Sequence, residues 1–141
     1  MPDLFNHYKP ARGISPVSVS DDTPFVSQII DRAGFEELDF VILTGSLGDA
    51  NATFTVLLEH DDASGFGTAE AVPDTALLGT EAGASFDYSH DNAVRKIGYQ
   101  GGKRYVRLTI TPSGNGSAAL VAAVALLGRP RILPQSSQSG A

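Results

Sequence analysis

The strongest local signal for β-structure is the stretch Val94-Arg-Lys-Ile-Gly-Tyr-Gln-Gly-Gly-Lys-Arg-Tyr-Val-Arg-Leu-Thr-Ile-Thr111. Two segments rich in β-forming residues flank Gly101-Gly102, and glycine readily adopts the positive φ angles of a two-residue hairpin turn. In the second segment apolar and polar residues alternate, which places Val106, Leu108 and Ile110 on one face and Tyr105, Arg107 and Thr109 on the other. The stretch predicts a β-hairpin with one buried and one solvated face.

Further strands are predicted upstream of this stretch. Residues 38–44 are apolar on both faces, as in a buried strand, and residues 53–59 alternate with one apolar face. Shorter segments rich in β-formers occur at 17–20 and 25–30, with turn residues between them. About seven to nine strands at this spacing predict an all-β fold, a single β-sandwich or jelly-roll-like domain over residues 17–128.

Three segments have less decisive patterns. The run Ala118–Leu127 is apolar throughout and permits a helix, but its short length and the Gly-rich turn before it favour a central strand covered on both faces. Residues 84–88 read as a weak strand. Residues 70–79 fit a short helix or an irregular loop equally well.

Both ends of the chain are predicted to lie outside the sandwich. Residues 1–16 contain Pro2, Pro10 and Pro16, which block helix and internal strand, so we expect an extended N-terminal arm. The aromatics within it are consistent with an arm that docks on a partner, and a disordered leader is the alternative. Residues 129–141 are rich in Ser, Gln, Gly and Pro and predict a flexible C-terminal tail.

Composition excludes several classes of protein. The net charge is −6 and the ten basic residues are scattered, which disfavours a nucleic-acid partner. The chain has no cysteine and therefore no disulfide, zinc-thiolate site or thiol nucleophile. The N-terminus lacks the apolar core of a signal peptide, and the longest apolar run is about half of what a membrane helix needs. We expect a soluble protein that does not bind a membrane.

Catalytic motifs are missing from the sequence, so we expect neither an enzyme nor a cofactor. There is no nucleophile elbow, phosphate-binding loop, dinucleotide fingerprint or His-Glu-x-x-His motif. Two runs, 60–62 and 87–91, mix carboxylates with a histidine and could hold a metal ion if their loops met. Neither run has the spacing of a known calcium loop, which favours solvated turn residues and no metal site.

Basic residues gather on the predicted hairpin, at Arg95, Lys96, Lys103, Arg104 and Arg107. They form either a solvated face or the rim of a surface that meets an acidic partner. Tyr99 and Tyr105, expected to be exposed beside them, favour the second interpretation because tyrosine is enriched at interfaces. The candidate partner-binding residues are therefore Phe5, His7, Tyr8, Lys9 and Arg12 of the arm and Tyr99, Lys103, Arg104 and Tyr105 of the hairpin.

The segments 101–114 and 122–131 resemble small structural proteins of tailed bacteriophages and prophages. Among these, the capsid decoration (cement) protein is similar in size, in β content and in having a projecting N-terminal arm. The resemblance implies a virion protein on the capsid surface, made in the cytoplasm of a bacterial host. It also implies the major capsid protein and further copies of the chain as partners, with a homo-trimer favoured by analogy.

Three other functions remain open at the level of sequence. The chain could be a tail, neck or connector subunit of the same virion, since those proteins also use β-sandwiches and arms. It could be a calcium- or carbohydrate-binding β module, although sugar-binding surfaces stack on exposed aromatics and this chain has no Trp. An enzyme on a jelly-roll scaffold ranks last.

Overall fold

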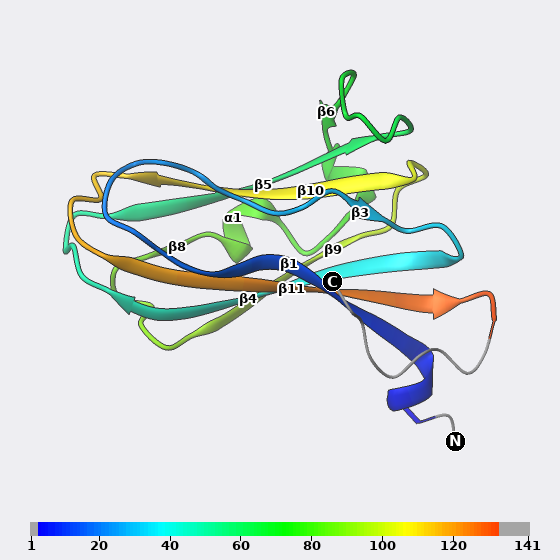
Figure 1. Cartoon of the computed structure of the whole chain (residues 1–141), viewed down its shortest axis with the longest axis horizontal. Coiled ribbons are helices and arrows are strands. Elements are labelled where there is room, and N and C mark those ends of the chain that lie inside the picture. Colours follow the sequence, from blue (N-terminus) through cyan, green and yellow to red (C-terminus); the bar gives the residue numbers. More distant parts are fainter. Residues whose placement is uncertain (1–2, 133–141) are drawn as a thin grey trace.

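The computed structural model describes residues 3–132, in which two antiparallel β-sheets pack face to face (Figure 1). The all-β sandwich predicted from the sequence is confirmed. Within residues 3–132 we find no helix with the length and apolar character needed to cross a membrane.

The five-stranded sheet has the strand order β1-β11-β4-β9-β7. Its members are β1 (Tyr8–Val19), β4 (Phe35–Leu47), β7 (Leu77–Leu78), β9 (Val94–Tyr99) and β11 (Ala119–Pro130). The long strands β1, β11 and β4 make up most of this sheet, and β7 is a two-residue edge.

The six-stranded sheet has the order β2-β10-β5-β6, with β3 also pairing with β10 and β8 with β5. Its members are β2 (Phe25–Val26), β3 (Ile30–Asp31), β5 (Thr53–Asp61), β6 (Glu70–Ala71), β8 (Phe86–Asp87) and β10 (Tyr105–Ser113). The helices among the described residues are η1 (Phe5–His7), η2 (Asp74–Ala76) and α1 (Glu81–Ala84). Residues 70–79, which the sequence left open as a short helix or an irregular loop, contain the short strands β6 and β7 with the 3-10 helix η2 between them. Residues 84–88 contain the end of α1 and the two-residue strand β8.

The core lies between the sheets and follows the alternation of the long strands. Leu38, Phe40 and Ile42 of β4 are fully buried, as are Val106, Leu108 and Ile110 of β10. At one end of the core the Phe54 ring stacks on Phe86 with a centroid distance of 4.9 Å. Burial of these apolar side chains is the main favourable contribution to folding.

The predicted hairpin does not form. β9 pairs with β4 in the five-stranded sheet, whereas β10 pairs with β5 in the six-stranded sheet, so Gly101-Gly102 crosses from one sheet to the other. Side chains hold this crossing in place: the Tyr99 hydroxyl accepts a hydrogen bond from Lys103 N at 2.9 Å, and Arg32 donates to the carbonyls of Gly101 and Lys103. β9 and β10 therefore do not pair with each other, and each buries its apolar side chains against the opposite sheet.

The apolar run Ala118–Leu127 forms most of β11, and β11 lies between β1 and β4 as a central strand. The prediction of a central strand is confirmed, but the prediction that both its faces are covered is wrong. From Ala119 to Leu127 the side chains of β11 alternate between buried and partly or largely exposed positions. Only the face toward the six-stranded sheet is covered.

The predicted N-terminal arm belongs to the sandwich for most of its length. The expected boundary at residue 16 falls inside β1, and Tyr8 to Arg12 pair residue by residue with Gly128 to Val124 of β11. Pro10 is tolerated because β1 is an edge strand. Gly13 lies where β1 shifts register, and a Cβ there would come within 2.9 Å of the Ala123 carbonyl oxygen. This close approach requires glycine.

At the other end, the expected tail begins inside a strand. Arg129 and Pro130 still belong to β11, and Arg131 N donates to the Gly34 carbonyl at 2.9 Å. The remainder of the predicted tail, residues 133–141, lies outside the described residues.

Candidate docking surface

The outer side of the five-stranded sheet carries a continuous set of apolar side chains. We call this set the apolar face: Val41, Leu43, Val94, Leu120, Ala122, Val124 and Leu126. The strand register makes it contiguous, because Val124 lies beside Val41, and Ala122 beside Leu43, which in turn lies beside Val94. Leu43 and Val94 are 53% and 62% exposed. A contiguous apolar area that is exposed to water is a candidate interaction surface.

Two adjoining grooves run along the apolar face, with volumes of about 530 and 450 Å³. Both are bounded by Pro16 of β1 and Leu43 of β4, and Ala122 of β11 lies in both. The grooves form because β11 places a short alanine side chain between bulkier groups on the two strands beside it. An extended apolar segment, or the apolar edge of a strand, fits such grooves.

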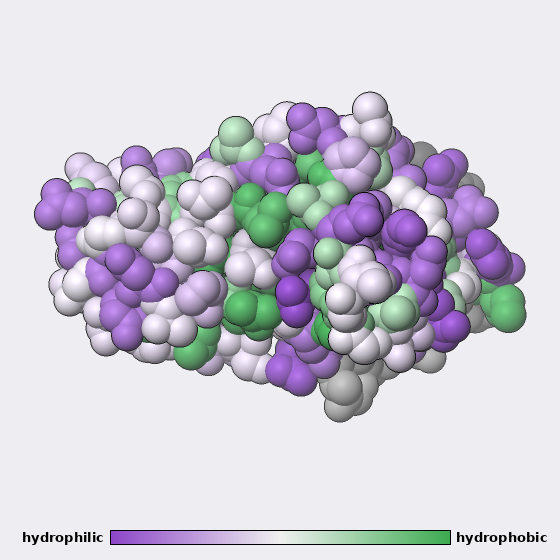
Figure 2. All heavy atoms as spheres, turned by 90° about the horizontal axis from the view of Figure 1, so that it is seen from above, coloured by the Kyte–Doolittle hydropathy of each residue, from purple (hydrophilic) through white to green (hydrophobic). Residues whose placement is uncertain are grey.

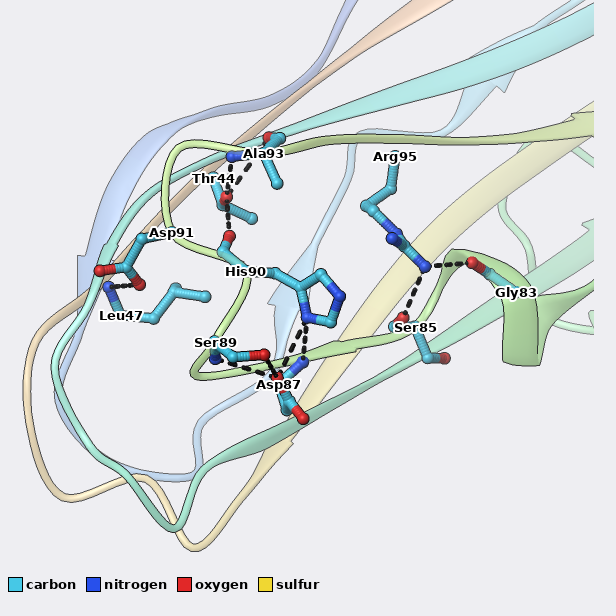
Figure 3. A network of polar contacts seen from close by, with 10 residues as sticks. All are labelled: Thr44, Leu47, Gly83, Ser85, Asp87, Ser89, His90, Asp91, Ala93 and Arg95. Carbon is cyan, nitrogen blue, oxygen red and sulfur yellow. Dashed lines mark hydrogen bonds and ion pairs between the residues drawn. The ribbon is translucent and has the colours of Figure 1, made fainter.

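One wall of the larger groove comes from the loop between β8 and β9, which supplies Asn92. Figure 3 shows how this loop is fastened to β4. The Thr44 hydroxyl donates to the His90 carbonyl at 2.6 Å and accepts from Ala93 N at 2.8 Å, and the Asp91 carboxylate accepts from Leu47 N at 3.0 Å. Asn92 N donates to the Gly45 carbonyl. The wall is therefore preorganised by β4 itself.

Charged residues border the apolar face on several strands. Arg12 and Lys96 lie in the row of Val124 and Val41, and Asp39 lies beside Leu126 one row further along. Burial raises the pKa of Asp39, the nearby Glu37 charge raises it further, and Lys96 opposes both. Charges of both signs at the border of an apolar area give an interface its register more than its affinity.

The outer side of the six-stranded sheet has a different composition. Its outward positions are mainly polar: Thr53, Thr55, Thr109 and Thr111, and the ion pair between Arg107 and Glu59 at 3.0 Å, with the apolar Val26 and Leu57 on either side of Thr109. Figure 2, which views the molecule from this side, shows mostly hydrophilic and intermediate residues with apolar ones in small patches. This side suits water, whereas the apolar face does not.

The predicted contact residues of the N-terminal segment lie at one end of the sandwich. Phe5 and His7 belong to η1, and Phe5 is 56% exposed. Tyr8 and Lys9 begin β1, and Arg12 borders the apolar face while its guanidinium donates to Ser15 and Gln28. Arg12 is the member of this group that adjoins the grooves.

The predicted contact residues of the hairpin are not brought together. The expectation that Tyr99 is exposed is wrong: it is fully buried, and its hydroxyl lies 2.9 Å from His60 Nδ1. Lys103 pairs with Asp62, Arg104 pairs with Asp31, and the Arg104 guanidinium also lies over the Tyr105 ring. Because β9 and β10 belong to different sheets, Arg95 and Lys96 are separated from the other basic residues.

The two acidic runs do not meet. Asp61 ends β5, whereas Asp87 pairs with Thr53 at the opposite end, about 27 Å away along the strand. Each carboxylate accepts hydrogen bonds in its own loop, Asp61 from Ala63 and Thr68 and Asp87 from Ser89. These bonds lower the pKa of both groups. Across residues 3–132, no three His, Cys, Asp or Glu side chains are grouped as a metal site.

The apolar face was not predicted from the sequence, although the sequence contains a signal for it. The run Ala118–Leu127 was expected to be covered on both faces, and its outward residues Leu120 and Val124 are 45% and 44% exposed instead. A strand that is apolar on both faces in a two-layer sandwich leaves one apolar side outward. Counting the layers that the chain is long enough to build would have identified the surface.

The chain matches no protein-family model and no curated protein. Among solved structures it is similar to the N-terminal endo-1,4-β-D-xylanase 10B of Clostridium thermocellum, a carbohydrate-binding module with a catalytic module complexed with xylohexaose. That match has 11% identity and a TM-score of 0.44, and it covers 94% of this chain and 28% of that one. The chain thus spans under a third of the xylanase structure.

Two phage-derived structures are similar at the same level. The SPBc2 prophage-derived protein YomS has 13% identity and a TM-score of 0.43 over 84% of this chain and 92% of that one. The enzymatically active domain of bacteriophage CBA120 tailspike protein 4 has 9% identity and a TM-score of 0.46 over 86% and 19%. Similarity this low transfers no ligand, partner or activity to this chain.

Proposed function

We propose that the protein is a non-catalytic structural protein of a phage virion, a capsid decoration protein that binds the outer surface of the head and stabilises contacts between major capsid subunits. The observation that carries the proposal is the apolar face, which a chain working alone in water has no reason to expose. The virion setting rests on the resemblance of segments 101–114 and 122–131.

The physical role of such a protein suits this architecture. A shell under internal pressure fails by separation of its subunits, so a rigid body seated across their boundaries raises the cost of failure. The sandwich supplies the rigid body, and the apolar face with its preorganised loop supplies the contact. Many copies on one shell add avidity without stronger individual contacts.

The test is attachment of purified protein to expanded heads that lack it, measured by co-sedimentation. We expect binding by the unaltered protein and by Thr55→Glu/Thr111→Glu, whose charges are added to the six-stranded sheet. Leu43→Glu/Leu120→Glu should lose binding by about a hundredfold or more, because each glutamate must be desolvated at the contact. Equal binding by the two double variants would remove the apolar face from the proposal.

The other virion positions predict a different behaviour. A tail, neck or connector subunit should not bind expanded heads, whether or not it forms rings or tubes on its own. Such a result would overturn the decoration role and retain the virion setting.

A calcium- or carbohydrate-binding module predicts that the melting temperature rises when calcium or an oligosaccharide is added. The groove residues are aliphatic, polar or small and include no aromatic ring for a sugar to stack on. A rise in the melting temperature with either ligand would favour the module over the virion protein.

A further inference from the structure

A second surface, unrelated to the apolar face, lies at the end of the sandwich where β3 turns into β4. Arg32, Arg104 and Arg131 line a cavity of about 260 Å³ with the backbone of Gly34 and Gly102, which we call the arginine cavity. Three guanidinium groups around one small cavity are unusual on a chain with a net charge of −6. Planar guanidinium groups match carboxylates in two-pronged hydrogen bonds.

The charges of the arginine cavity are not balanced by the chain itself. Arg104 pairs with Asp31 at 2.8 Å. Arg32 donates to the carbonyls of Lys103, Phe35 and Gly101, so no carboxylate neutralises it. The Arg131 side chain makes no hydrogen bond or ion pair with any described residue, and its backbone is anchored on Gly34. The Arg32 charge therefore has no carboxylate beside it, and the Arg131 guanidinium is the group of the cavity that can meet an anionic partner.

Two residues near the arginine cavity have backbone conformations with a positive φ angle. Arg129, two residues before Arg131, has a φ of 50°, which is unfavourable for a residue with a side chain. Gly34 has a φ of 88°, and its carbonyl accepts the bond from Arg131 N. Together these two residues bring the end of β11 back to the β3–β4 turn and place Arg131 at the cavity.

The opposite end of the sandwich carries the complementary charge. The loops 20–24, 48–52, 87–93 and 113–118 meet there, as hydrogen bonds from Asn115 N to Asp22 and from Gly116 N to Asp49 show. We call it the acidic end: Asp21, Asp22, Asp49, Asp87 and Asp91, with no Lys or Arg in these four loops. Its formal charge of −5, from five Asp, is most of the chain's total of −6.

The acidic end of one chain cannot reach its own arginine cavity. β4 runs from one end to the other, and its 13 residues span about 40 Å. In Figure 1 the two ends lie at opposite sides of the molecule. Any contact between the two surfaces is therefore a contact between copies.

We propose that the arginine cavity binds carboxylates of the acidic end of a second copy of this chain, so that copies associate head to tail. Such an interface uses two different surfaces, and it closes into a ring when the rotation between copies permits. A cyclic oligomer needs this kind of interface, because a self-complementary patch yields only pairs.

The association should depend steeply on salt. Sedimentation velocity of the purified chain should show oligomers at about 20 mM salt and monomers near 1 M, where the screening length falls to roughly 3 Å. A chain that is monomeric at low salt over the accessible concentrations would overturn the proposal.

Variants of each surface give a stricter test. Arg131→Glu reverses a charge in the arginine cavity. The triple change Asp21→Asn, Asp49→Asn, Asp87→Asn leaves only Asp22 and Asp91 charged at the acidic end, while keeping side-chain oxygens that can accept the loop hydrogen bonds. Each should weaken self-association by about tenfold or more. Lys96→Glu makes the same change of charge as Arg131→Glu, but at the border of the apolar face. It should leave self-association unchanged.

Mixing the two defective proteins decides between head-to-tail and symmetric contacts. An intact arginine cavity on one variant meets an intact acidic end on the other, so an equimolar mixture should form dimers and nothing larger. A mixture that stays monomeric, or a Lys96→Glu variant that dissociates like Arg131→Glu, would overturn the proposal. The experiment contains no phage heads, so its outcome is independent of head attachment.

Discussion

The outer sides of the two sheets differ although their inner sides are alike. Both sheets point alternate apolar residues into the shared core, as β5 and β10 do on one side and β4 and β11 on the other. Outward, the six-stranded sheet presents mainly threonines and an Arg107–Glu59 pair, with only Val26 and Leu57 apolar beside Thr109, while the five-stranded sheet presents leucine, valine and alanine. The inward residues specify the fold. The outward residues distinguish the six-stranded sheet, whose outer side is solvated, from the five-stranded sheet, whose outer side is suited to contact with a partner.

The largest expected effect is a difference in unfolding free energy between substitutions at two adjacent residues of β11. Val121 is 2% exposed and Leu120 is 45% exposed. Val121→Asp should lower the free energy of unfolding by about 3–5 kcal/mol, because it buries an unpaired charge. Leu120→Asp should change it by about 0.5 kcal/mol or less. Denaturant unfolding measures both, and similar losses would mean that the outer side is already packed against something.

A smaller effect concerns the polar contact that joins the two sheets, between His60 of β5 and Tyr99 of β9. The Tyr99 hydroxyl accepts from Lys103 N and lies 2.9 Å from His60 Nδ1. Burial lowers the pKa of His60, and the Lys103 charge lowers it further, against the nearby Glu70, Asp62 and Asp61. The unfolded chain therefore binds more protons than the native chain once the pH falls below about 6.5.

Stability should accordingly decrease as the pH is lowered from about 7.5 toward 5, and His60→Gln should flatten this dependence. The carboxylates with lowered pKa titrate below about 4 and do not contribute in this window. Thermal unfolding at a series of pH values provides the measurement. An equally steep decrease in His60→Gln would assign the effect to another group.

The next prediction exchanges the character of the two outer sides. Leu43→Thr/Leu120→Thr should give the five-stranded sheet the chemistry of the other, with a change in unfolding free energy of about 1 kcal/mol or less. Binding of a hydrophobic fluorescent dye should fall. The matched pair Thr55→Val/Thr111→Val should raise dye binding on the six-stranded sheet, and no difference between the pairs would remove the contrast.

The smallest effect is expected from the charged pair on the six-stranded sheet. Arg107 and Glu59 are 29% and 24% exposed and lie directly opposite each other on β10 and β5. Glu59→Gln should cost about 1 kcal/mol or less, since partly exposed ion pairs contribute little. A loss as large as that of Val121→Asp would mean that this side is not the solvated one.

Alternation along single strands could be predicted from the sequence, and the pairing of strands could not. The patterns of 53–59 and 105–111 predicted which side chains are buried, because that choice depends on local polarity. The prediction of a hairpin at Gly101-Gly102 was wrong. The local turn signal contains no information about Arg32, nearly seventy residues upstream, whose hydrogen bonds hold the crossing between the sheets.

The candidate surfaces were harder to predict than the fold. Tyr99 was expected at the surface because tyrosine is common at interfaces, and its burial depends on His60 and Arg32, which no local pattern links to it. The arginine cavity collects residues from three separate strand ends, and only the tertiary structure brings them together. Arg12 alone among the predicted contact residues adjoins the grooves of the apolar face.

The pairing of Tyr8 with Gly128 has a mechanical consequence. The first and last strands lie antiparallel and leave the body side by side, so a pull on the two chain ends would peel β1 from β11 one hydrogen-bonded pair at a time. Peeling of this kind meets little resistance, whereas sliding whole sheets requires all pairs to yield together. Tension in an assembly should therefore pass through the broad sides or the loops of the sandwich, and fusions at the chain ends should serve as tethers and not as struts.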